Sequence, residues 1–171
     1  MSIRILHKAT IVTSEKEAVG SVVITDGTIS DVLYAEGADF DWQIRNILDK
    51  HPEAEVMDLE GKHLMAGGID AHVHFREPGL THKADMATES LAAVAGGVTT
   101  VFDMPNTNPA TVSAEHLKDK IGLAEGRSLA KIGFHIGATN SNAMKISDLV
   151  KRGDADTGIT PDDIAGVKIF M

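Results

Sequence analysis

From residue 68 onward the chain alternates short apolar segments with longer amphipathic ones, and this alternation limits its possible folds more than any other feature. The short segments have the length and the β-branched content of strands, at residues 69–75, 98–104, 131–139 and 166–171. The segments between them predict helices at 81–97, 113–128 and 141–153. Strands and helices that alternate at this spacing form parallel βαβ units.

Polar residues gather at the ends of these strands, as they do at the C-terminal face of a (β/α)₈ barrel. The predicted fold class is therefore α/β, with the first half of a TIM barrel preceded by a small, mostly-β module. A complete barrel needs ~250 residues, whereas this chain has 171 and finishes on an apolar strand. We expect the chain to be truncated relative to a working domain, or to be completed by further polypeptide.

The first 65 residues have a different pattern. Short segments of β character, separated by turns, occur at residues 3–6, 10–13, 20–25 and 28–34. A helix is predicted at 39–52, and two further short strands flank the turn at Glu60-Gly61. We therefore expect two domains, a β-rich module over residues 1–65 and the half-barrel over 66–171.

Composition narrows the class of partner. The formal net charge of −9 argues against nucleic acid and against an anionic membrane surface, because both bind basic faces. The chain has no cysteine, which excludes disulfides and thiolate metal sites. The N-terminus has no apolar run of signal-peptide length, so a cytoplasmic protein is expected.

The stretch "GGIDAHVHFREPG" (67–79) carries the clearest chemical signal. On a strand, His72, His74 and Arg76 would point to one face, because alternate side chains share a face. Two imidazoles at this spacing can reach one metal ion, and zinc suits them. The alternative is that these residues are polar groups on an exposed strand face. The position of the strand at the start of the βαβ series favours the metal site.

This stretch, together with "AGGVTTVFDMPNTNP" (95–109), resembles the cyclic amidohydrolases, and most closely the dihydroorotases. The resemblance implies a metal-dependent barrel in which His72 and His74 bind zinc. It also implies that Arg76 and Asn106 bind the carboxylate of the substrate.

The same resemblance implies that Lys168 carries a CO₂-derived carboxylate and bridges two zinc ions. The alternative is an ordinary strand lysine whose amine reaches solvent, and some dihydroorotases use an aspartate for the bridge. His135 is interpreted as a packed or barrel-mouth histidine, and Asp103 as a residue that could support a metal-binding histidine.

The implied reaction is the reversible zinc-dependent opening of dihydroorotate to N-carbamoyl-aspartate in pyrimidine biosynthesis. The family's remaining metal histidines and its catalytic aspartate come from later strands. No catalytic residue is therefore assigned within this chain, and the chain alone is expected to lack turnover. The alternatives are a non-catalytic dihydroorotase-like scaffold subunit, or a related dihydropyrimidinase, hydantoinase or allantoinase. The expected partners are the small-molecule substrate and either further copies of the chain or a completing polypeptide.

Overall fold

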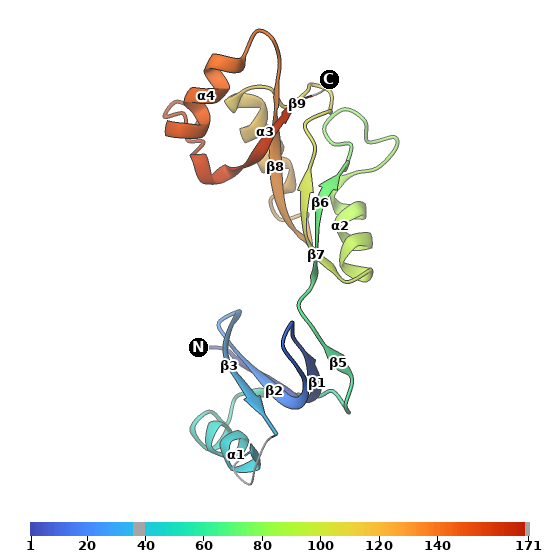
Figure 1. Cartoon of the computed structure of the whole chain (residues 1–171), viewed down its shortest axis with the longest axis vertical. Coiled ribbons are helices and arrows are strands. Elements are labelled where there is room, and N and C mark those ends of the chain that lie inside the picture. The colour runs from blue at the N-terminus through green and yellow to red at the C-terminus, as the bar shows by residue number, and fades with distance from the viewer. Residues whose placement is uncertain (36–39, 170–171) are drawn as a thin grey trace. The chain divides into compact units, whose positions relative to one another are not determined.

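The computed structural model describes residues 1–35 and 40–169, which form two compact units (Figure 1). Unit 1 is Met1–Ala66 and unit 2 is Gly67–Met171. Among the described residues, no helix is long and apolar enough to cross a membrane.

Unit 1 is a mixed sheet with one helix. Its elements are β1 (Ile3–Val12), β2 (Glu17–Thr25), β3 (Thr28–Tyr34), α1 (Phe40–Lys50), β4 (Glu55–Asp58) and β5 (His63–Leu64). The sheet order is β3-β2-β1-β4, and β5 also pairs with β1. The short strands on either side of Glu60-Gly61 and the helix are confirmed, although Asp39, where the helix was expected to begin, lies outside the described residues.

The strands expected at 3–6 and 10–13 are instead one strand, β1. Its register with β2 shifts between Leu6 and Ala9, and Lys8 has a φ of 54°. The chain therefore bulges at Lys8 and continues in the same sheet, whereas a turn between the two strands was expected.

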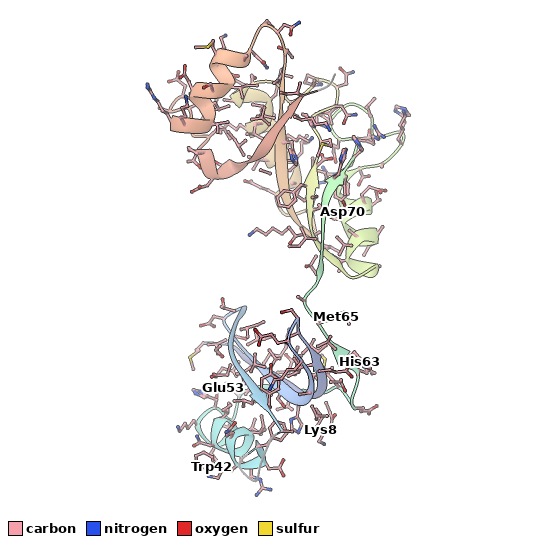
Figure 2. All side chains as sticks on the ribbon, in the orientation of Figure 1. Lys8, Trp42, Glu53, His63, Met65 and Asp70 are labelled. Carbon is pink, nitrogen blue, oxygen red and sulfur yellow. The ribbon has the colours of Figure 1, made fainter. Side chains whose placement is uncertain are left out.

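Helix α1 covers the sheet of unit 1 with Ile44, which packs with Ile5 and Val23 in one buried cluster. Trp42 lies on the same helix but is 63% exposed (Figure 2). His7 is half-buried, where its Nδ1 lies 2.9 Å from the Ser21 hydroxyl and its ring stacks on Phe40.

Unit 2 has the predicted alternation of strands and helices. Its elements are β6 (Gly68–Val73), α2 (Met86–Ala95), β7 (Val98–Asp103), α3 (Ala114–Ala124), β8 (Lys131–Ala138), α4 (Ala143–Arg152), the short 3₁₀ helix η1 (Pro161–Asp163) and β9 (Ile164–Ile169). The strands pair in parallel in the order β6-β7-β8-β9 (Figure 1). A parallel half-barrel after a β-rich module is the predicted fold class, which is thereby confirmed. The last two residues of the expected strand 166–171 lie outside the described residues.

Helices α2 and α3 begin at their capping residues. The Ser113 side chain accepts a hydrogen bond from the His116 N–H and so caps the N-terminus of α3. Helix α2 was expected from residue 81 but begins at Met86, because the Asp85 side chain caps the Thr88 N–H. Residues 81–83 form a turn instead.

The sheet of unit 2 has two chemically different faces. Val101, Phe134 and Ile136 are buried in one cluster with Leu117 of α3, which is 0% exposed. Side chains that alternate with these residues lie on the opposite face. That face, called the histidine face below, carries His72, Phe102, His135 and Lys168.

Replacing Leu117 by alanine is expected to lower the free energy of unfolding of unit 2 by about 3 kcal/mol, because the buried leucine leaves a cavity. Leu129 is 64% exposed, and its replacement by alanine should change stability by less than about 0.5 kcal/mol. Urea unfolding followed by circular dichroism measures both values. Equal losses in the two variants would contradict this position for the core.

Candidate functional site at the ends of the parallel strands

His72 and His74 lie together where β6 ends. Their ring centroids are 5.3 Å apart, with an angle of 53° between the ring planes. His72 is exposed and His74 is half-buried. The Asp70 carboxylate accepts a hydrogen bond from the His72 N–H at 3.0 Å, so this aspartate shapes the strand locally. Two imidazoles this close can bind a common ion, and they fit a zinc site.

A hydrogen bond joins His74 to Asn106, which lies in the loop after β7. The Nδ1 atom of His74 lies 2.7 Å from Oδ1 of Asn106. An amide oxygen only accepts hydrogen bonds, so Nδ1 is the donor, and in the neutral ring Nε2 keeps a lone pair. This is the tautomer that a histidine needs to bind a metal through Nε2.

Arg76 departs from the sequence expectation. Strand β6 ends at Val73, and Arg76 has a φ of 64°, so the alternation of side chains does not extend to it. The Arg76 carbonyl instead accepts a hydrogen bond from the Leu80 N–H at 3.0 Å, within a turn. Arg76 therefore belongs to the loop that leaves the strand and not to the strand face that holds the histidines.

Glu77 holds this loop in place. It is 8% exposed, and its Oε2 accepts a hydrogen bond from the Met86 N–H at the start of α2. Its Oε1 accepts a hydrogen bond from Nη1 of Arg127 at 2.8 Å, and this contact raises the pKa of the Arg127 guanidinium. Sequence reasoning missed this pair, because nothing local links residues 50 positions apart.

The loops that carry Arg76 and Asn106 contact each other. The Asn108 N–H donates a hydrogen bond to the Pro78 carbonyl at 3.1 Å. Gly79 has a φ of 80°, and a Cβ atom there would collide with the Asn108 backbone. Arg76 and Asn106 are the two residues predicted to bind the substrate carboxylate. This close approach brings their loops to the same edge of the sheet.

Lys168 and His135 lie further along the histidine face. In the β8–β9 register Gly137 pairs with Lys168 and His135 pairs with Gly166, so the two side chains share a face. Lys168 is half-buried. His135 packs edge-on against Phe102, with ring centroids 6.2 Å apart. Burial lowers the pKa of His135, and the nearby charges of His72 and Lys168 lower it further.

Asp103 is buried on the opposite face of the sheet, where its Oδ1 accepts a hydrogen bond from the Phe75 N–H at 2.9 Å. Its partner Lys120, from α3, was not identified from the sequence. The available signal was a charged residue inside the apolar stripe formed by Leu117, Ile121 and Ala124. His116 is half-buried on the same helix.

Within residues 1–35 and 40–169, no three His, Cys, Asp or Glu side chains are grouped closely enough to hold a metal ion together. The described residues therefore bring together one pair of imidazoles and two loops at one edge of the sheet, with Lys168 on the same face.

Comparison with known proteins places this geometry in context. The family model described as Dihydro-orotase-like matches residues 61–169. A dihydroorotase of Methanothermobacter thermautotrophicus is 45% identical over 92 residues, which cover 54% of this chain and 21% of that protein. An allantoinase of Desulfitobacterium hafniense is 39% identical over 137 residues, which cover 78% of this chain and 30% of that protein.

Solved structures agree on the fold. The L-hydantoinase from Arthrobacter aurescens superposes with a TM-score of 0.73 over 98% of this chain and 32% of that chain, at 21% identity. A D-hydantoinase structure gives a TM-score of 0.66 at 26% identity, over 87% of this chain and 30% of that chain. This chain spans between about a fifth and a third of the length of the relatives it matches.

The lowered pKa of His135 predicts a pH dependence of stability. Between the folded pKa and the ordinary value near 6.5, the unfolded chain binds more protons than the folded chain. The free energy of unfolding should therefore fall as the pH drops below about 6.5 toward the folded pKa. His72, Lys168 and Asp103 are the charged or titratable neighbours that set this value.

In a His135→Gln variant, the free energy of unfolding should fall less steeply as the pH drops below about 6.5. The contributions of the other histidines are present in both proteins and cancel in the difference between them. Urea unfolding at a series of pH values between about 5 and 8 measures the difference. Identical slopes for the two proteins would show that His135 does not titrate abnormally.

The contact between the two loops predicts an effect of Gly79→Ala. A left-handed alanine costs about 1–2 kcal/mol by itself, and the collision with Asn108 adds to that cost. Gly126 provides a matched control, since its φ is 68° and a Cβ atom there would meet nothing within 4 Å. Gly79→Ala should lower the free energy of unfolding more than Gly126→Ala does. Equal losses would mean that the loops do not contact each other in solution.

Proposed function

Because this chain belongs to the Dihydro-orotase-like family, we propose that it forms the first part of the zinc and substrate site of a dihydroorotase. The reaction is the reversible hydrolysis of dihydroorotate to N-carbamoyl-aspartate. Water adds to the ring carbonyl, the ring C–N bond breaks, and the nitrogen gains a proton. Zinc, when bound, lowers the pKa of coordinated water toward ~7 and polarises the carbonyl.

The hydrogen bond between His74 and Asn106 is the observation that carries this proposal. His72 and His74 are proposed as zinc ligands, and the bond to Asn106 leaves Nε2 of His74 ready to coordinate. With its oxygen used in this way, the amide NH₂ group of Asn106 remains to donate to a substrate carboxylate. One side chain then links the metal site to the carboxylate site.

Arg76 is proposed as the main partner of that carboxylate. A guanidinium can donate two parallel hydrogen bonds to a carboxylate, which fixes its orientation as well as its position. The contact between Asn108 and Pro78 supports a shared role for the loops of Arg76 and Asn106. Holding the carboxylate at two points would orient the ring so that one carbonyl faces the metal site.

Lys168 is proposed as the residue that, after carboxylation by CO₂, would bridge two zinc ions. A carbamate forms only from a neutral amine, so the lysine must lose its proton first. Its half-buried position on the histidine face, in the same sheet as His72, supports this role. Its amine would otherwise serve only as a cation near the site.

An allantoinase is the second candidate, because a relative of that name matches a larger share of this chain than the dihydroorotase does. The two functions differ in the chemistry of the ring, since allantoin has no carboxylate for Arg76 to bind. Recognition of the carboxylate therefore separates the two candidates.

A matched pair of ligands tests the proposal. Dihydroorotate and dihydrouracil share one ring and differ in the carboxylate, so zinc-loaded chain should bind dihydroorotate more tightly. Arg76→Lys should weaken dihydroorotate binding by at least about tenfold, because a charge-assisted bidentate contact is worth about 1.5–3 kcal/mol. Its effect on dihydrouracil should be negligible. Calorimetry with both ligands and with allantoin measures these affinities.

Zinc titration provides the control for the metal. His72→Ala and His74→Ala should each abolish or strongly weaken zinc binding, while His63→Ala, on an exposed histidine in unit 1, should leave it unchanged. Preference for allantoin, or equal affinity for dihydroorotate and dihydrouracil, would reject the dihydroorotase assignment.

A further inference from the structure

Lys120 is the most unusual charged residue among those described. It is 0% exposed, yet it lies on α3 between residues that face the core of unit 2. Its Nζ atom is 2.8 Å from Oδ2 of Asp103, whose side chain is also buried. The same Nζ donates a hydrogen bond to the Met104 carbonyl at 2.8 Å.

A contribution to stability does not by itself explain why Asp103 and Lys120 are buried together. Removing two charges from water is costly, and burial accordingly lowers the pKa of Lys120 despite the opposing effect of Asp103. Replacing such a pair by apolar side chains is often neutral or even stabilising. The backbone groups that the pair binds, the Phe75 N–H and the Met104 carbonyl, suggest instead that it positions the chain around them.

Asp103 holds the end of β6. Its Oδ1 accepts a hydrogen bond from the Phe75 N–H, while the Met104 N–H donates to the Val73 carbonyl at 3.0 Å. Phe75 and Val73 are the two chain neighbours of His74. The backbone on both sides of this histidine is therefore tied to the end of β7.

Lys120 binds the segment that carries Asn106, which is the side-chain partner of His74. The Met104 carbonyl, which accepts its hydrogen bond, lies two residues before Asn106. Asn106 in turn accepts a hydrogen bond from Nδ1 of His74. The contacts form a closed circuit that runs from Lys120 through Asp103 to His74, then through Asn106 and Met104 back to Lys120.

We infer that Lys120, acting with Asp103, is a positioning residue that holds Asn106 against His74 and so keeps His74 in the tautomer protonated at Nδ1. The consequence for zinc affinity rests on the proposed function, whereas the tautomer does not. Supporting partners of this kind typically change metal affinity by about 10–100-fold when they are removed.

The decisive variant combines Asp103→Asn with Lys120→Met. The Asp103→Asn change keeps an oxygen for the Phe75 N–H, and the introduced methionine nearly matches the length of lysine but cannot donate to the Met104 carbonyl. This variant removes the charges together, so no unpaired charge is left in the core. A second variant, Asp103→Leu with Lys120→Met, also removes the acceptor for Phe75.

The readout is the ¹⁵N spectrum of the His74 imidazole in the metal-free chain at a pH where the ring is neutral. Wild-type His74 should be protonated at Nδ1. The double variant D103N with K120M should lower that population, and D103L with K120M should lower it further. Zinc affinity should fall about tenfold in the first variant and more in the second.

Leu117→Ala is the matched control, because Leu117 is equally buried on the same helix but makes no contact with either strand end through a polar group. It should destabilise the fold without changing the His74 tautomer. A wild-type tautomer in folded D103N with K120M would overturn the inference, as would a change of the same size in Leu117→Ala. If wild type binds no zinc, the proposed function fails, while the metal-free spectra still test the role of Lys120.

Discussion

The buried contact between Asp103 and Lys120 determines how two neighbouring strands of unit 2 end. Parallel strands finish at the same edge of a sheet, but the edge alone does not decide where each side chain points. Here a carboxylate inside the core binds the backbone after His74, and an ammonium binds the backbone before Asn106. The polar groups on one face of the sheet are thus oriented by a charged pair on the other face.

A second constraint acts where the chain leaves β6. Arg76 turns away from the strand with a left-handed backbone, and Glu77 anchors the following loop to Met86 and Arg127. This arrangement separates the two tasks proposed for His72, His74 and Arg76, which the sequence places on one strand. The histidines stay on the sheet, and the guanidinium moves to a loop that contacts the loop of Asn106.

The fold followed from the sequence because periodicity and caps are local properties. The strand–helix alternation of unit 2 was predictable in this way. The turn at Arg76 and the late start of α2 at Met86 depend on Glu77, whose partners are distant in sequence. Lys120 was missed for a related reason. A lysine in an apolar stripe usually extends to solvent, and only the structure shows Asp103 and the Met104 carbonyl beside its amine.

Relatives of this chain are named dihydroorotase and allantoinase, and an L-hydantoinase has the same fold, so the fold cannot select among these substrates. A pair of imidazoles that binds zinc would serve any cyclic amide equally well, because the metal acts on the carbonyl that all these rings share. Discrimination must come from groups that contact the part of the ring that differs. In this chain the groups proposed for that task are the guanidinium of Arg76 and the amide of Asn106. The Asn106 amide also fixes His74, so the residue proposed to read the carboxylate is bonded to a residue proposed to bind the metal. Substrate choice and metal geometry would then be coupled through one hydrogen bond.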